Sequence, residues 1–134
     1  MKEAEIIGKI VNALSDIEDA TAISASDFTD ERDAYMIVVG IESTTQVNVN
    51  LPDYQYRVSI VIDCFIDDDA DGAKFNEVHK NVRRIIGEYE HKEKPLDSLF
   101  EEIPVVGFFF ENEDITVDDK SNRAVLYCNV IASF

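Results

Sequence analysis

The chain has 134 residues, the usual size of one domain, and 46% of them are hydrophobic, so we expect a single folded domain over residues 1–134. It carries 28 acidic and 12 basic side chains, for a formal net charge of −16, and this negative field disfavours binding to nucleic-acid phosphates or anionic membranes. The acidic start of the chain is unlike a signal peptide, and the longest near-apolar run, residues 103–110, is too short to span a bilayer, which predicts an unprocessed protein made in the cytoplasm.

The first third of the chain predicts a helix followed by strands. Apolar residues from Ala4 to Leu14 recur at helical spacing, which indicates an amphipathic helix that ends near Ser15. A short strand is predicted at 21–25. Residues 35–41 are apolar at nearly every position, which is typical of a strand covered on both faces. The polar stretch 42–53 then forms a long connection, with a hairpin arm as the alternative.

The clearest signal lies over 54–66, where every second residue from Tyr54 to Ile66 is apolar. A period of two over this length predicts a long strand with one buried face. Apolar residues between Phe75 and Tyr89 then repeat at steps of three and four, which predicts a second helix with Asp71 as its N-cap.

The last third predicts a short turn or helix over 96–100 and a strand over 105–111. An acidic connection, 111–121, leads into a final strand over 124–134. The order is therefore helix, strands, helix, strands. It predicts an α+β fold with a mixed, mainly antiparallel sheet and two main helices packed on one face.

Residues 67–72 read Asp-Asp-Asp-Ala-Asp-Gly, which reproduces the opening of a calcium-binding loop. The candidate ligands are Asp67, Asp69 and Asp71. The twelfth position of such a loop supplies a bidentate carboxylate, but here it is Val78, which the apolar face of the helix needs. The sequence therefore favours a solvated acidic turn that complements the helix dipole, and a calcium-binding interaction module is the alternative function.

No group of residues has the spacing of a catalytic centre, so we expect neither enzymatic activity nor a cofactor. His79 and His91 have no neighbouring Ser or Cys nucleophile, and the glycines form no phosphate-binding loop. Cys64 and Cys128 lie within apolar strand patterns, which indicates reduced core thiols, with a disulfide as the alternative. A small enzyme accessory subunit without a recognisable motif is the second alternative function, and it would need a deep pocket with a perturbed carboxylate.

Two features point to protein binding. Half of the 12 basic residues lie between positions 74 and 94, among them Arg83 and Arg84. We favour ordinary helix-surface pairs such as Arg84 with Glu88, and docking of this helix onto the acidic surface of another copy or of a partner protein is the alternative. The run 108–110 is Phe-Phe-Phe and places rings on both faces of its strand, so that one ring is a candidate interface anchor.

Three segments carry a resemblance that spans nearly the whole chain. They are the alternating strand Tyr56-Arg57-Val58-Ser59-Ile60-Val61-Ile62, the helix with Val82-Arg83-Arg84-Ile85-Ile86, and the closing strand Leu126-Tyr127-Cys128-Asn129-Val130. In element order and hydrophobic pattern the chain resembles the tail terminator, or tail completion, proteins of long-tailed bacteriophages. The likeness includes no catalytic motif, since that family has none to match.

The resemblance implies a structural subunit of a phage virion, located at the tail or neck. It implies a ring, typically of six copies, that caps the head-proximal end of the tail tube and joins it to the neck or connector proteins. DNA would pass through the ring without sequence-specific binding, because an acidic lining repels the genome and lets it slide. We expect tube or neighbour contacts on the connections 42–53 and 111–121, since long loops on a rigid sheet commonly carry binding. The interface candidates are Thr44, Thr45, Gln46, Tyr54, Arg83, Arg84, Phe109, Glu111, Glu113 and Asp114.

Overall fold

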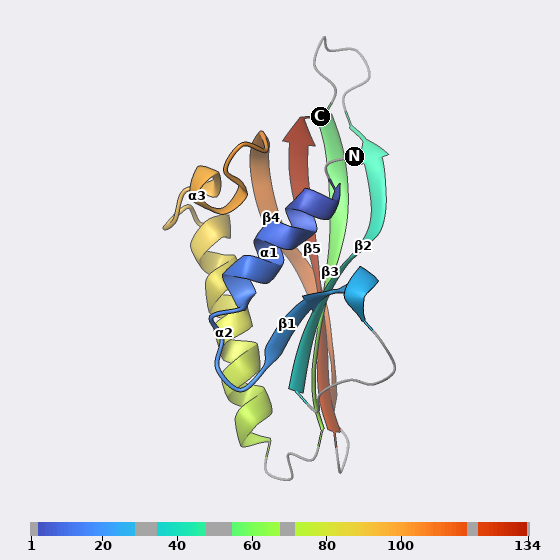
Figure 1. The fold of residues 1–134 in the computed structure, drawn as a ribbon, viewed down its shortest axis with the longest axis vertical. Helices are drawn as coiled ribbons and strands as arrows, with labels where there is room; N and C mark the ends of the chain where they lie inside the picture. The colour runs from blue at the N-terminus through green and yellow to red at the C-terminus, as the bar shows by residue number, and fades with distance from the viewer. Residues whose placement is uncertain (1–2, 29–34, 48–54, 68–71, 118–120, 134) are drawn as a thin grey trace.

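Three α-helices and five strands make up the described part of the chain (Figure 1). The computed structural model describes residues 3–28, 35–47, 55–67, 72–117 and 121–133. In chain order the elements are α1 (Glu3–Leu14), β1 (Thr21–Ser24), the 3-10 helix η1 (Ala25–Asp27), β2 (Tyr35–Gln46), β3 (Gln55–Asp67), α2 (Ala73–Glu90), α3 (Leu96–Phe100), β4 (Val105–Val117) and β5 (Ser121–Ser133).

The strands form one sheet in the order β1-β2-β3-β5-β4. Strand β1 runs parallel to β2, and every other neighbouring pair is antiparallel. Strands β3 and β5 pair without a break from Gln55↔Ser133 to Asp67↔Ser121, so they form the centre of the sheet. The predicted α+β fold with a mixed, mainly antiparallel sheet is confirmed.

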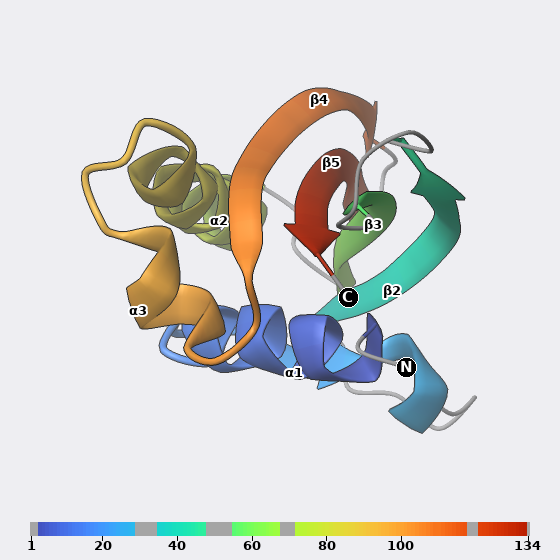
Figure 2. The ribbon, with the colours of Figure 1, turned by 90° about the horizontal axis from the view of Figure 1, so that it is seen from above.

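Helices α1 and α2 pack on the same face of the sheet, which curves around them (Figure 2). We call this the inner face and the opposite one the outer face. The periodicity of the sequence explains the arrangement, because one side chain in two along β3 and β5 points inward to meet the apolar stripes of the helices. The fully buried core side chains include Ile6, Leu14, Val82, Ile60, Ile62 and Leu126.

Two segments predicted as connections begin as strands. Strand β2 continues to Gln46 and pairs with β3 as far as Gln46↔Tyr56, so residues 42–46 form the hairpin arm that the sequence left as an alternative. The prediction of an acidic connection over 111–121 is wrong for its first part, because β4 continues to Val117 and pairs with β5. Backbone pairing with β5, the next strand along the chain, outweighs the poor strand preference of Glu, Asn and Asp.

The N-terminus of α2 also differs from the prediction. Gly72 occupies the N-cap position in the left-handed region, with φ 71°, and its carbonyl accepts a hydrogen bond from the NH of Asn76 at 2.9 Å. Glycine adopts this conformation without steric cost. The predicted cap, Asp71, lies outside the described residues.

Strand β2 is buried on both faces only in its first part, where Met36 on the outer face and Ile37 on the inner face are both buried, and its free edge is also covered there. Strand β1 pairs with β2 from Met36 to Val39 and then ends. The following η1 approaches Gly40 so closely that a Cβ at this position would lie 3.0 Å from the Cβ of Ala25. Beyond it Ile41 is 37% exposed. The far half of β2 is therefore more open than the near half.

Candidate interaction surface

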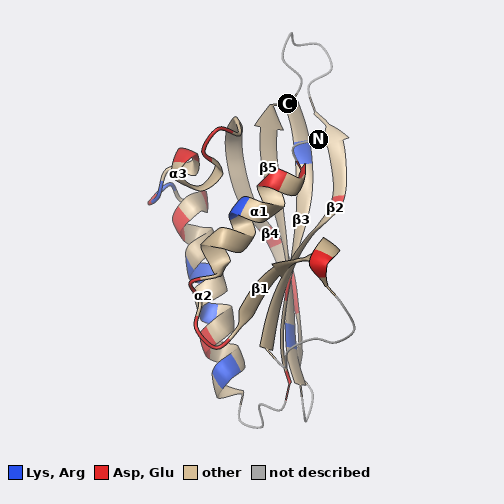
Figure 3. Cartoon of the chain, viewed as in Figure 1, with Lys and Arg blue, Asp and Glu red and all other residues tan. Residues whose placement is uncertain are grey.

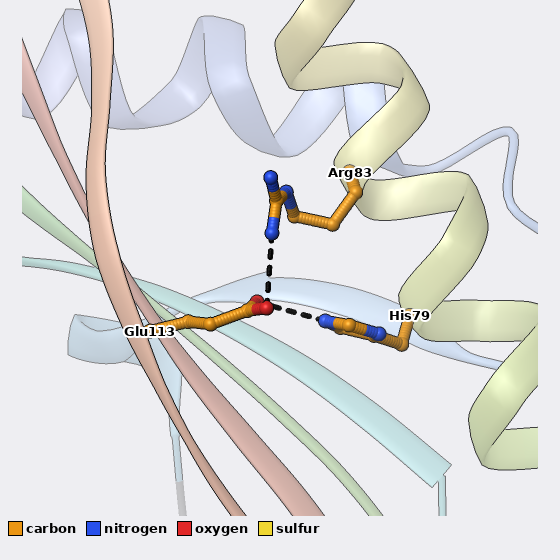
Figure 4. Close-up of polar contacts among 3 residues, drawn as sticks. All are labelled: His79, Arg83 and Glu113. Carbon is orange, nitrogen blue, oxygen red and sulfur yellow. Dashed lines mark hydrogen bonds and ion pairs between the residues drawn. The ribbon is translucent and has the colours of Figure 1, made fainter.

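A polar cluster joins α2 to β4 (Figure 4). Nε2 of His79 donates to Oε2 of Glu113 at 2.8 Å, and Nη1 of Arg83 donates to Oε1 of the same carboxylate at 2.9 Å. The imidazole of His79 stacks on the ring of Phe75, and the guanidinium of Arg83 lies 3.9 Å from the centre of the Phe110 ring. Two interface candidates, Arg83 and Glu113, are therefore partners of each other within one chain, where they fasten the acidic part of β4 to the helix.

Other basic residues near α2 also have intramolecular partners, although Figure 3 shows that cations gather on this helix. Nη1 of Arg84 donates to Glu88 at 2.7 Å, as the sequence predicts, and Nζ of Lys94 lies 2.9 Å from the same carboxylate. The hydrogen bond from Lys94 and then that from Arg84 hold the pKa of Glu88 below its usual value. Nζ of Lys74 lies 4.4 Å from the centre of the Tyr35 ring. Much of the basic charge of this segment is thus satisfied locally.

The outer face of the sheet carries a groove of about 560 Å³ between the far part of β2 and the middle of β4. At its floor Ser59 donates to Oδ1 of Asn129 at 3.1 Å, and Nδ2 of Asn129 donates to Glu111 at 3.1 Å. Phe109 lines the groove and is 50% exposed. Arg57 also lines it, and this cation has no hydrogen bond or ion pair with any residue that the structure describes. The groove combines an exposed ring, an amide and an unpaired cation, which are groups that protein interfaces favour.

A second hollow of about 470 Å³ lies on the outer face near the other end of the sheet. Arg123 makes two hydrogen bonds to Asp63 there, at 2.9 and 2.6 Å, and these raise the pKa of the guanidinium. The ring of Phe28 meets that of Phe65 edge to face, with centroids 6.5 Å apart. Because the charges of this hollow are already paired, it offers less to a partner than the groove with Arg57.

Four further interface candidates lie on strands. Thr44, Thr45 and Gln46 form the end of β2, and Asp114 is exposed on β4. Tyr54 lies outside the described residues. Arg57 and Asn129 were missed by the sequence analysis. The alternation of residues 54–66 places Arg57 on the solvent face, but only the strand order reveals that Asn129 and Glu111 lie across the same groove.

The acidic turn is described only in part. Asp67 ends β3, whereas Asp69 and Asp71 lie outside the described residues. Within the described ranges, no group of three or more His, Cys, Asp or Glu side chains is placed to hold a metal ion. The calcium-binding alternative therefore stays a prediction.

Both cysteines are free thiols buried in the core. Burial raises the pKa of each thiol to about 12. Such thiols are poor nucleophiles, since the thiolate is the reactive form. The prediction of reduced core cysteines is confirmed.

No helix in the described part of the chain has the length and apolar character needed to cross a bilayer.

One of the comparisons with known proteins finds a solved structure of similar fold. Neither the protein-family models nor the curated proteins compared with this sequence include a match to it. The structure is similar to a chain from the virion of a native gene transfer agent (GTA) particle, with a TM-score of 0.63. The match covers 96% of this chain and 92% of that chain, at 12% sequence identity. At this identity the likeness concerns the fold alone.

Proposed function

We propose that this chain is a structural subunit of a phage-like virion, and that it acts as a tail terminator. In this role several copies, six in the family that the sequence resembles, form a ring at the head-proximal end of the tail tube. The ring joins the tube to the neck and leaves an open channel for DNA. The observation that carries the proposal is the end-to-end likeness in fold to a chain of a gene transfer agent virion.

The distribution of charge supports a role in which DNA passes and is not held. In the described part of the chain, the basic side chains that form ion pairs with carboxylates include Lys9, Arg83, Arg84, Lys94 and Arg123. Since the chain has 28 acidic and 12 basic residues, many carboxylates are left for the surface. A channel lined by such groups repels phosphates and lets the duplex slide.

The groove with Arg57 and Phe109 supports a role in assembly. An exposed aromatic ring beside an unpaired arginine provides the kinds of side chain that dominate protein interfaces. We therefore propose that this part of the outer face takes part in an assembly contact.

The position of the chain in the particle tests both parts of the proposal, namely that the chain is a virion subunit and that it acts as a tail terminator. Particles from the source culture are purified on a density gradient, and the chain is quantified by mass spectrometry and located by immunogold electron microscopy. We expect the chain in the particle fraction, with gold at the junction of head and tail. Particles from a strain that lacks the chain serve as the labelling control, and we expect them to have unjoined or overlong tails.

Different outcomes contradict different levels of the proposal. A chain that is absent from purified particles would contradict a virion role. Gold at the tail tip or along the tube would leave the virion role intact and exclude the tail terminator. A copy number far from six per particle would exclude the expected ring size.

A further inference from the structure

Besides the short edge strand β1, two segments at the edges of the sheet have no strand partner among the described residues. Residues 41–46 of β2 extend beyond the end of β1, and β4 lies at the opposite end of the strand order. An edge strand exposes backbone NH and C=O groups that another strand can pair with. Neither 41–46 nor 111–117 contains the lysine or proline with which proteins often prevent such pairing.

Two interface candidates on β2, Thr44 and Gln46, have backbone NH and C=O groups that point away from β3 toward the unpaired edge of the sheet. The NH of Val47 donates to the carbonyl of Gln55 on β3 at 2.9 Å. In an antiparallel pair, residues whose NH and C=O groups bond to the neighbouring strand alternate with residues whose groups point away from it. The NH and C=O groups of Thr45 therefore point toward β3, as those of Val47 do. The NH and C=O groups of Thr44 and Gln46 therefore point to the free edge.

The edge of β4 is open in its second half. Glu90 of α2 closes the edge at Phe110, where its carboxylate accepts the backbone NH at 2.5 Å. Beyond this point Ile115 is 49% exposed and Val117 is 75% exposed. Their partners on β5 are the buried residues Ala124 and Asn122, so both side chains lie on the inner side of the sheet. They are large apolar groups without a cover in the described chain.

A groove beside the edge of β2 is suited to such side chains. It has a volume of about 460 Å³ and lies between α1, η1 and β2. Its apolar lining includes Ala4, Ile7, Val39 and Ile41. Val39 and Ile41 pair with the buried Ile62 and Ile60, so the groove lies on the inner side of β2.

The directions of the two strands allow them to pair between copies. Passing from β2 through β3 and β5 to β4 involves three antiparallel steps, so β2 and β4 are antiparallel to each other. Copies related by rotation about an axis along the strands bring β4 of one beside β2 of the next, with the inner faces on the same side. Such a head-to-tail contact closes into a ring when the rotation permits.

Charge complementarity also favours a second copy of this chain as the partner. Arg57 lies on the outer face one strand in from the edge of β2, opposite Thr45. Asp114 is exposed and pairs with Val125, which places it on the outer face of β4. Joining the edges brings this carboxylate toward the cation, which has no partner within the described chain.

We propose that β4 of one copy pairs antiparallel with β2 of the next copy, and that Ile115 and Val117 enter the groove between α1 and β2. This inference rests on the ring assembly proposed above. The subunit contact then extends the sheet from one copy to the next. Each copy pairs through β4 with one neighbour and through β2 with the other.

Variants of each edge test the contact in the full-length chain. Thr44→Pro removes an outward NH while sparing the bonds to β3, and Thr44→Val is its control because it keeps the NH. Ile115→Asp places a charge in the groove, and Ile115→Val is its control. Ring formation is measured free in solution by native mass spectrometry and on tail tubes by electron microscopy, with thermal melting to confirm folding. We expect both control variants to form rings and the other two to lose them.

Mixing the two defective variants tests whether the contact is head to tail. Thr44→Pro keeps an intact β4 edge and Ile115→Asp keeps an intact β2 edge, so an equal mixture has one competent contact. We expect heterodimers of two 15.1 kDa chains and no ring. Rings from either folded variant alone would overturn the edge contact and leave the tail terminator role standing. A wild-type chain that never self-associates, free or on tubes, would overturn both.

A crosslink provides a test that does not depend on damaged edges. Thr45→Cys is combined with Asp114→Cys or with Thr116→Cys, since all three positions lie on the outer face near the joined edges. The native thiols, with a pKa of about 12, do not compete. Each double variant is first shown to form rings as the wild type does, and the rings are then oxidised. We expect a ladder of disulfide-linked chains from one of the two double variants. Thr45→Cys alone is the control, and the absence of a ladder from both double variants would refute the pairing.

Discussion

Replacing Glu113 with glutamine perturbs the cluster that holds β4 against α2. The carboxylate accepts one hydrogen bond from His79 and one from Arg83, and its side chain is only 19% exposed. Glutamine has nearly the same shape but lacks the negative charge. Its amide oxygen can retain one of the two bonds, while its NH₂ group faces the other donor.

The expected loss of stability follows from these contacts. A hydrogen bond to a charged group contributes about 1.5–3 kcal/mol when it is shielded from water. The Arg83 side chain is 40% exposed, so solvent screening reduces its share. We therefore expect Glu113→Gln to lower the free energy of unfolding by about 1–2 kcal/mol. For a domain of this size that corresponds to a fall in Tm of roughly 3–10 °C.

Thermal and urea unfolding followed by circular dichroism measure the effect, with Asp114→Asn as the matched control. Both substitutions remove one negative charge from the same strand, so any relief of charge repulsion is common to both. Asp114 is exposed and has no partner in the described chain, and its replacement should change stability by less than about 0.5 kcal/mol. If the two variants unfold at the same temperature, the cluster does not stabilise β4 and the reasoning fails.

Three further predictions concern the core, acid stability and the thiols. Ile62, on the central strand, has a side chain with 0% exposure, and Ile62→Ala should lower the free energy of unfolding in urea by about 2–5 kcal/mol. Val125→Ala on the outer face should lower it clearly less, and equal losses would contradict the assignment of the inner face as the core. The pKa of Glu88 is lowered in the folded state, so the contribution of Glu88 to stability is present above its usual pKa of 4.5 and is lost as the pH falls below that value. Glu88→Gln should therefore flatten the fall of stability in acid. An unchanged slope of stability against pH would count against the contacts of Glu88 with Lys94 and Arg84. The thiols of Cys64 and Cys128 have a usual pKa of 9.0 and a folded pKa of about 12, so they stabilise the fold below pH 9.0 and lose this contribution as the pH rises toward 12. Near neutral pH they should not react with Ellman's reagent until the chain unfolds, and rapid labelling of the native protein would disprove their burial.

The sequence predicted well those elements whose signal is local. The alternation over 54–66 identified β3 and its buried face, because a strand turns every second side chain to the same side. Strand β4 was predicted to end near residue 111, since Glu-Asn-Glu-Asp has the composition of a loop. The contacts of Glu113 with His79 and Arg83 could not be predicted, because the cluster joins residues 34 and 30 positions apart.

By itself the sequence determined the α+β class, the apolar faces of both helices and the side of each central strand that enters the core. These follow from side-chain periodicity along a single element. Only the tertiary structure decided the strand order, the parallel pairing of β1 and the two open edges at 41–46 and 111–117. The physical reason is that any strand can offer its backbone to any other, so neighbours and edges are selected by packing between distant segments and not by local pattern.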